Sequence, residues 1–198
     1  IDQQADIEKI WCLGDMIAMG PDSNEVLEIL FAREDVQMIT GNHDEAILSL
    51  IAGEGHPDSY KHTREHHEWI ASRLNPEHVA KLKTLPRILG IHYHIEETKR
   101  QAHIQDEPFY TILEPTIENM EIMFGDYQAD IICFGHHHPE HLFQANGKTY
   151  LNPGALGVSK GDTAPYGIID LTEDEAQVTI HQVTYDKATF LEKFERLQ

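Results

Sequence analysis

The chain has 198 residues, enough for one substantial domain with a full hydrophobic core. Its 40% hydrophobic and 25% charged residues are typical of a globular protein, and no apolar run approaches the roughly 20 residues of a membrane helix. The formal net charge of −19 argues against a dedicated nucleic-acid binder, although bound divalent metals would still let a small phosphate substrate approach. Both cysteines lie in apolar segments, where they read as buried hydrophobic residues, so a reducing cytoplasm is the expected location.

The first part of the chain alternates predicted strands with predicted helices. Apolar periodicity predicts strands at residues 9–13 and 36–40 and helices at 23–33, 45–51 and 60–74. Residues 41–44 between them are expected to form a loop. Asn75 followed by Pro76 is typical of a capped helix start, and that helix should end before Leu85.

The second part is richer in strands. A strand is expected at 87–92, a long polar loop at 93–115, a helix at 116–124 and a strand at 129–134. Asn146 and Gly147 separate two short strands, which predicts a hairpin with a type I′ turn. Two antiparallel strands at 166–171 and 177–183 and a helix at 186–197 follow. With no repeat and no linker, residues 1–198 are expected to form a single domain of the α/β class.

Three predicted strands end in glycine followed by a side chain that can bind metal. Asp15 follows the first strand, residues 41–44 (Gly-Asn-His-Asp) follow the second, and His136 to His138 follow the strand at 129–134. In extended backbone His136 and His138 would point the same way, which suits a pair of metal ligands. Because sites collect at the carboxyl ends of strands in α/β sheets, these groups together predict a metal centre.

These motifs, in this order, resemble those of the calcineurin-like metallophosphoesterases. The matching residues are Gly14, Asp15 and Gly20, then residues 41–44, His92, and Gly135 with His136 and His138. The resemblance covers nearly the whole chain and is closest to the small bacterial and archaeal phosphodiesterase-like members. It implies a four-layer α/β/β/α sandwich of two mixed β-sheets flanked by helices.

The resemblance also implies a two-metal site and a role for each of its residues. The metal ligands would be Asp15 between two ions, Asn42, His92 and His136 on one ion, and His138 on the other. His43 would act as general acid towards the leaving-group oxygen, and Asp44 would hold the His43 imidazole and favour its charged form. Metal-bound hydroxide would attack the phosphorus. Mixed Asp, Asn and His ligands suit two divalent transition metal ions, such as Mn, Fe, Ni or Zn.

Several residues have competing interpretations. Spacing alone does not distinguish His92 from His94 as the ligand, since both project to one side of an extended strand; His92 is favoured because it ends the apolar run. His62 and His66 have a metal-binding i, i+4 spacing, but a solvated helix face explains them better. Taken alone, Asp15 reads as a turn carboxylate, and His136 and His138 read as surface histidines.

The family's first motif, D-x-H on the first strand, is not in these residues. We expect it upstream of Ile1, so that the chain as given lacks its first strand and part of its first helix. Without it, His138 and Asp15 alone would hold one of the ions, fewer than the three protein ligands usual for a catalytic metal.

The expected function is hydrolysis of a small phosphodiester or nucleotide-type phosphate, with no nucleic-acid or membrane partner; a homo-oligomer is compatible with the sequence. One alternative is a phosphomonoesterase or protein phosphatase on the same fold. Another is a non-catalytic binding module with an incomplete metal centre. A DNA-directed nuclease is disfavoured by the net charge of −19.

Overall fold

A computed structural model describes residues 7–87, 89, 114–158, 161–172 and 175–196. The chain divides into two compact units, Ile1–Tyr110 (unit 1) and Thr111–Gln198 (unit 2), and each is described by itself. None of the helices within the described residues has the length and apolar character of a membrane-spanning segment.

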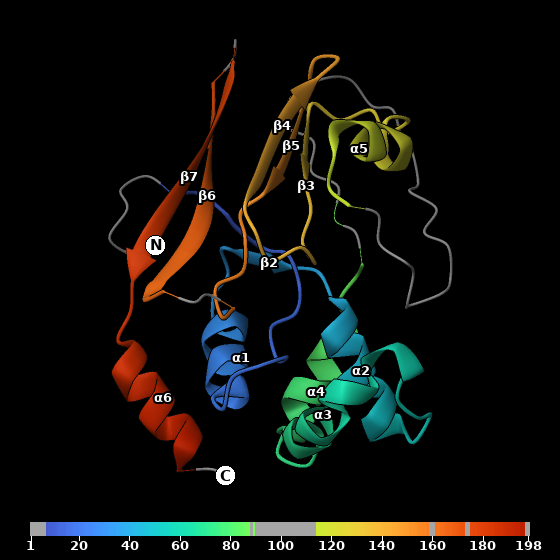
Figure 1. The fold of residues 1–198 in the computed structure, drawn as a ribbon, viewed down its shortest axis with the longest axis vertical. Coiled ribbons are helices and arrows are strands. Elements are labelled where there is room, and N and C mark those ends of the chain that lie inside the picture. Colours follow the sequence, from blue (N-terminus) through green and yellow to red (C-terminus); the bar gives the residue numbers. More distant parts are fainter. Residues whose placement is uncertain (1–6, 88, 90–113, 159–160, 173–174, 197–198) are drawn as a thin grey trace. The chain divides into compact units, whose positions relative to one another are not determined.

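Unit 1 combines a small parallel sheet with a group of helices (Figure 1). Its elements are β1 (Ile10–Cys12), α1 (Ser23–Phe31), β2 (Val36–Met38), α2 (Asn42–Ala52), the 3₁₀ helix η1 (Asp58–Thr63), α3 (Arg64–Ala71) and α4 (Pro76–Leu82). Strands β1 and β2 pair in parallel, with Ile10 opposite Val36 and Cys12 opposite Met38. Their carboxyl ends therefore meet at one edge of the sheet.

The core of unit 1 is formed where its helices pack together. It consists of the buried side chains of Ile17, Leu27, Ile47, Ile70, Leu74 and Leu82. Leu27 comes from α1, Ile47 from α2 and Ile70 from α3, so one apolar cluster joins the helices that follow β1 and β2. Burying side chains of this size contributes about 1.5–3 kcal/mol each, so the cluster stabilises the packing of the helices that follow the two strands.

Unit 2 contains the remaining strands and two helices. Its elements are α5 (Ile117–Phe124), β3 (Ile131–Cys133), β4 (His141–Ala145), β5 (Lys148–Asn152), β6 (Thr163–Leu171), β7 (Ala176–Thr184) and α6 (Lys187–Glu195). The first three strands form a mixed sheet in the order β3-β5-β4, and β6 and β7 form an antiparallel pair. Asn146 and Gly147 both have positive φ, which confirms the predicted type I′ hairpin between β4 and β5.

Three expectations about local structure were wrong. Residues 42–44 are not loop but the first turn of α2, because Gly41 is the residue that caps the helix. The expected helix at 60–74 is divided into η1 and α3. Residues 136–138 are not extended, since His136 has a φ of 74°. The expected strand at 87–92 lies almost entirely outside the described residues.

Candidate functional site

The carboxyl ends of β1 and β2 bring Asp15 against the start of α2. Gly14 has a φ of 91°, and a Cβ there would lie 2.7 Å from the backbone N of Gly41. A Cβ on Gly41 would in turn collide with the carboxylate of Asp15. Glycine at both positions therefore lets the two loops touch, as expected for parallel strands that end side by side.

The Asp15 carboxylate is held at the N-terminus of α2. The backbone N–H of His43 donates a hydrogen bond of 2.9 Å to Asp15 Oδ1. This end of a helix stabilises negative charge, because its first N–H groups lack intrahelical partners. Asp15 also has a φ of 54°, a left-handed conformation that a residue with a side chain seldom adopts. The fold thus holds one carboxylate in a strained, fixed position at the strand ends.

Asp44 is completely buried and is surrounded by backbone donors. Its Oδ2 accepts from the backbone N–H groups of Asp15 and Gly41, both at 2.9 Å. Its Oδ1 accepts from those of Met16 at 3.0 Å and Ile17 at 3.3 Å. Burial, and secondarily the charge of Asp15, raises the pKa of Asp44 to about 7, while these hydrogen bonds act in the opposite direction.

Asp44 was predicted to hold the His43 imidazole, but its hydrogen bonds in the structure go to backbone N–H groups. Asp44 is the third residue of α2, from which its carboxylate reaches back to Gly41 and across to the loop after β1. Both of its oxygens bind that backbone. The partner of His43 is instead His67 of α3, whose Nε2 lies 3.0 Å from His43 Nδ1. Asp44 thus binds the backbone of the two loops.

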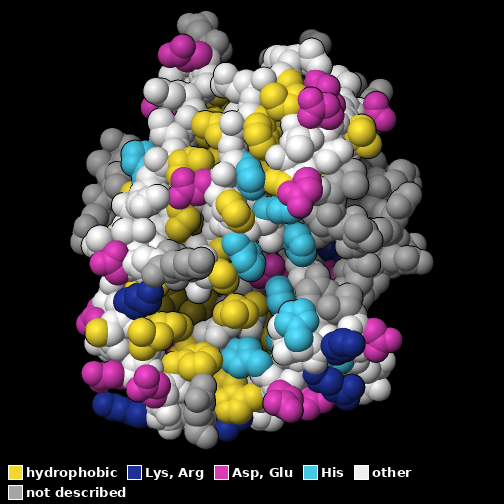
Figure 2. All heavy atoms as spheres, in the orientation of Figure 1, with side chains coloured by type: hydrophobic (Ala, Val, Ile, Leu, Met, Phe, Trp, Pro, Cys, Tyr) yellow, Lys and Arg dark blue, Asp and Glu magenta, His cyan; other side chains and the backbone are white. Residues whose placement is uncertain are grey.

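His67 continues to a third histidine. Its Nδ1 lies 2.8 Å from Nε2 of His56, in the segment that follows α2, and His67 itself has no exposed surface. Histidine side chains are also visible on the face of the molecule shown in Figure 2. No role was predicted for His67, although a signal was present: His67, Ile70 and Leu74 have the i, i+3, i+7 spacing of a buried helix face.

Burial makes His67 a neutral imidazole. Desolvation first, and then the charges of His43, His56 and the neighbouring His66 and His62, lower its pKa to about 4. A protonated ring would place a charge between two other imidazoles in the interior of unit 1. His67 therefore contributes a neutral donor and a neutral acceptor to this cluster at physiological pH.

His136 and His138 follow β3 in unit 2, in a tight turn. His136 has a φ of 74°, and the backbone N–H of His137 donates to the carbonyl of Gly135 at 3.0 Å. Asn152 at the end of β5 is buried, and its Nδ2 donates to the carbonyl of His137 at 2.7 Å. The backbone N–H of Ala155 donates to the carbonyl of His138 at 3.1 Å. A buried amide and the backbone of the next loop thus fix the turn that carries both histidines.

The predicted metal ligands are distributed over the chain as follows. Asp15 and Asn42 lie in unit 1, His136 and His138 lie in unit 2, and His92, with its alternative His94, lies outside the described residues. Within the described ranges, no group of three or more His, Cys, Asp and Glu side chains is arranged to hold a metal ion. The donors themselves fit a divalent transition metal, because a fixed carboxylate, an amide oxygen and imidazoles are its usual ligands.

Both cysteines are free thiols, Cys12 on β1 and Cys133 on β3. Burial raises the pKa of the Cys12 thiol and raises that of Cys133 to about 11. A thiol needs a lowered pKa to act as a nucleophile near neutral pH, so neither residue is suited to that chemistry.

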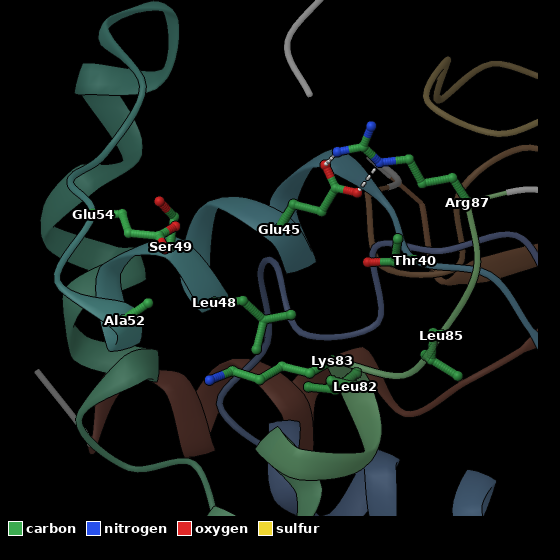
Figure 3. A pocket seen from close by; sticks show the side chains of 10 residues that line it. All are labelled: Thr40, Glu45, Leu48, Ser49, Ala52, Glu54, Leu82, Lys83, Leu85 and Arg87. Carbon is green, nitrogen blue, oxygen red and sulfur yellow. Dashed lines mark hydrogen bonds and ion pairs between the residues drawn. The ribbon is translucent and has the colours of Figure 1, made fainter. Parts of the chain in front are cut away.

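An open hollow of about 390 Å³ lies beside α2 and α4 (Figure 3). Arg87 and Glu45 form a two-point ion pair at its edge, with Nε to Oε1 at 2.5 Å and Nη2 to Oε2 at 3.0 Å. This pair ties the segment after α4 to the first turn of α2. Leu48, Leu82 and Leu85 line the hollow as well.

Comparison with known proteins identifies the family. The model of the calcineurin-like phosphoesterase superfamily domain matches residues 1–174, and the chain belongs to this superfamily. The uncharacterized protein MJ0912 of Methanocaldococcus jannaschii is 28% identical over 212 residues, which cover 94% of this chain and 80% of that protein. A symmetrical bis(5'-nucleosyl)-tetraphosphatase of Buchnera aphidicola is 42% identical, but over 45 residues that cover 22% of this chain and 16% of that enzyme.

Solved structures confirm the fold class. The hypothetical protein PH1004 from Pyrococcus horikoshii superposes with a TM-score of 0.70 and 19% identity, over 98% of this chain and 82% of that chain. A metallophosphoesterase from Sphaerobacter thermophilus gives a TM-score of 0.66 and 22% identity, over 98% and 84% of the two chains. The mixed α/β fold of the metallophosphoesterases, predicted from the motifs, is therefore confirmed, and the superfamily implies divalent metal ions.

Proposed function

We propose that this protein is a metal-dependent phosphoric ester hydrolase that cleaves phosphodiester or nucleotide-type phosphate bonds. Membership of the calcineurin-like phosphoesterase superfamily supports the reaction class. The observation that carries the proposal is the position of Asp15, whose carboxylate is fixed by the His43 N–H in a left-handed conformation at the strand ends. Strain of this kind persists where the surrounding structure enforces it, and it clusters at functional sites.

In this proposal the metal ligands are Asp15, Asn42, His92, His136 and His138. When bound, two divalent ions would polarise the phosphate and generate the hydrolytic nucleophile from water. His43 would protonate the leaving-group oxygen through Nε2, because its Nδ1 lies against His67. The hydrogen bond from the backbone N–H of His43 to Asp15 would hold the proposed acid and the metal-binding carboxylate close together.

The proposed substrate is a small phosphate ester or a nucleotide. The short matches to symmetrical bis(5'-nucleosyl)-tetraphosphatases favour a nucleotide, although those two cover only 22% and 24% of this chain. The net charge of −19 disfavours nucleic acid, whose many phosphates would all be repelled. A small ester places its few charges at the metal ions, where the repulsion is offset.

The deciding experiment measures hydrolysis of bis(4-nitrophenyl) phosphate, 4-nitrophenyl phosphate and a dinucleoside tetraphosphate by the full-length protein. Each assay is run with Mn²⁺, Fe²⁺, Ni²⁺ and Zn²⁺ in turn, and with a chelator as control. Faster turnover of the diester or of the nucleotide supports the proposal. Faster monoester turnover would indicate a phosphomonoesterase, and no turnover with any metal would favour a binding module.

The variant His43→Ala tests the proposed acid. We expect it to retain its bound metal and to lose about 10²–10⁴-fold in turnover, the usual contribution of a positioned proton donor. Metal content measured by mass spectrometry gives the control. If the variant loses its metal, His43 is a ligand and the assignment is wrong.

A further inference from the structure

Three histidines of unit 1 form a continuous chain of ring contacts. His67 lies in the middle, with its Nε2 3.0 Å from His43 Nδ1 and its Nδ1 2.8 Å from His56 Nε2. Both distances are those of hydrogen bonds. The ring centroids of His43 and His67 are 5.1 Å apart with the rings perpendicular, and those of His56 and His67 are 5.0 Å apart. Edge nitrogens therefore face one another at both junctions.

The two hydrogen bonds of His67 must run in the same direction. A neutral imidazole has one nitrogen that donates and one that accepts. Because His67 is fully buried and its pKa is lowered to about 4, it stays neutral and uses one nitrogen for each neighbour. The position of the proton on His56 consequently determines its position on His67, and that in turn determines its position on His43.

We propose that His67 is a positioning residue that couples His43 to His56, and that the three rings relay a proton from the surface of unit 1 to the leaving group. This inference rests on the proposed hydrolase function, in which His43 protonates the leaving-group oxygen. It adds two residues, His56 and His67, for which the family motifs provide no role.

The relay conserves protons and charge. Before the reaction, His56 Nε2–H donates to His67 Nδ1, His67 Nε2–H donates to His43 Nδ1, and His43 carries its proton on Nε2. His43 Nε2–H then passes to the leaving-group oxygen, His67 Nε2–H to His43 Nδ1, and His56 Nε2–H to His67 Nδ1. Solvent water supplies a proton to His56 Nδ1 and is left as hydroxide, which takes up the proton released when another water becomes the nucleophile. Every ring ends neutral, in its other tautomer. The chain resets when water protonates His43 Nε2, the protons on His43 Nδ1 and His67 Nδ1 return to His67 Nε2 and His56 Nε2, and His56 Nδ1 releases its proton to the hydroxide formed at His43.

The fold places His56 so that it can serve as the outer end. The α2 helix ends at Gly53, whose φ is 75°, and Gly55 follows with a φ of 106°. These two left-handed glycines turn the chain back so that His56 meets α3. His56 remains partly exposed, whereas His67 is sealed from solvent. The chain of rings thus connects the partly exposed His56 to His43, whose backbone N–H binds Asp15.

The test compares two leaving groups in the full-length, metal-loaded protein. Proton donation matters for a poor leaving group such as phenoxide and little for 4-nitrophenoxide. We expect His67→Gln and His56→Gln to lower kcat at least about tenfold with a phenyl ester and less than about threefold with the matched 4-nitrophenyl ester. The control is His181→Gln, an exposed histidine of β7, which should change neither rate. Equal losses with both esters, or a loss in His67→Gln alone, would overturn the relay.

A second measurement separates this inference from the proposed function. If the wild-type protein hydrolyses no ester with any metal, the proposed function fails, and the coupling is then judged by ¹⁵N NMR of the imidazoles. A coupled chain predicts that His56→Gln shifts the tautomer of His43, two rings away, whereas His181→Gln does not. An unchanged His43 spectrum in His56→Gln would overturn the coupling itself.

Discussion

At the scale of single residues, Asp44 shows how a side chain beside a proposed catalytic histidine can have a structural task. Its two oxygens accept hydrogen bonds from four backbone N–H groups. Three of these groups lie in the loop after β1, 27 to 29 residues earlier in the sequence, and the fourth is that of Gly41. Backbone donors in such a tight junction cannot be hydrated, so their satisfaction depends on this carboxylate. The motif Gly-Asn-His-Asp therefore connects the loop after β1 to the start of α2, in addition to carrying the proposed metal ligand Asn42 and the proposed acid His43.

The variant Asp44→Ala should accordingly unfold more easily. It removes the acceptor of four N–H groups at a fully buried position, for which we expect a loss of about 3 kcal/mol or more in the free energy of unfolding. Urea denaturation without added metal measures this loss. The matched control is Asp58→Ala, an exposed aspartate of the same unit, which should change the stability by less than about 0.5 kcal/mol. A similar small effect for Asp44→Ala would contradict the structural role.

His67 predicts a specific dependence of stability on pH. Its folded pKa of about 4 lies below the ordinary value of 6.5, so the unfolded chain binds the proton more readily. Its contribution to stability is therefore complete above pH 6.5 and is lost as the pH falls from 6.5 towards 4. Between pH 8 and pH 5 the loss should be about 2 kcal/mol.

The variant His67→Gln isolates this contribution. The difference in the free energy of unfolding between wild type and variant should shift by about 2 kcal/mol in favour of the variant when the pH is lowered from 8 to 5. Taking the difference removes the titration of Asp44, which both proteins share. A difference that is independent of pH would mean that His67 is not held neutral by its surroundings.

At the scale of elements, the sequence predicted those helix and turn boundaries that depend only on neighbouring residues. Asn75 caps α4 by accepting from the backbone N–H of Glu77 at 2.9 Å, and Pro76 is the first helical residue, as predicted. The hairpin at Asn146 and Gly147 was equally local. The start of α2 was not, because the Asp44 carboxylate that binds the backbone N–H of Gly41 also binds the loop after β1, which is distant in sequence.

The turn after β3 shows the same limit of local signals. Gly135 ends the predicted strand, but the left-handed residue of the turn is His136. Asn152, 16 residues further along, secures this turn through the carbonyl of His137. Glycine adopts a left-handed backbone more easily than histidine does, so a histidine at position 136 indicates a use for its side chain. The sequence alone does not reveal that this position is left-handed.

The C-terminus of α2 offers a clean test of element geometry. Gly53 ends the helix with a φ of 75°, and the backbone N–H of Glu54 donates to the carbonyl of Ser49 at 3.0 Å. A Cβ on Gly53 would meet no atom within 4 Å, so Gly53→Ala should be opposed only by the left-handed backbone. We expect a loss of about 1–2 kcal/mol in the free energy of unfolding.

Gly157→Ala provides the matched control for this substitution. A Cβ on Gly157 also has no neighbour within 4 Å, and its backbone is not left-handed. The control should be neutral or slightly stabilising, because alanine restricts the unfolded chain more than glycine does. Equal destabilisation by both variants in urea denaturation would show that the cap is not the cause.

At the scale of the whole molecule, the set of motifs and their order along the chain predicted the superfamily, which no single motif would have done. The proposed ligands come from segments as far apart as Asp15 and His138, so only a long-range fold can assemble them. Hydrogen bonds of backbone groups fix Asp15 and the turn that contains His136. Such bonds leave no signal in the composition or periodicity of the sequence. The partners of His43 were missed for the same reason, since α3 reaches it through tertiary packing.

A bound metal should stabilise the whole protein by mass action. If the proposed ligands hold divalent ions in the native state alone, Mn²⁺ at about 100 times its dissociation constant should add about 2.7 kcal/mol per site to the free energy of unfolding. Asp15→Asn replaces the carboxylate proposed to lie between the ions, keeps the acceptor oxygen that His43 N–H requires, and should abolish most of this increment. The measurement is thermal unfolding with and without Mn²⁺. The control is Asp58→Asn, whose response to Mn²⁺ should equal that of the wild type; an undiminished response in Asp15→Asn would remove Asp15 from the metal centre, even if the protein proves to be a hydrolase.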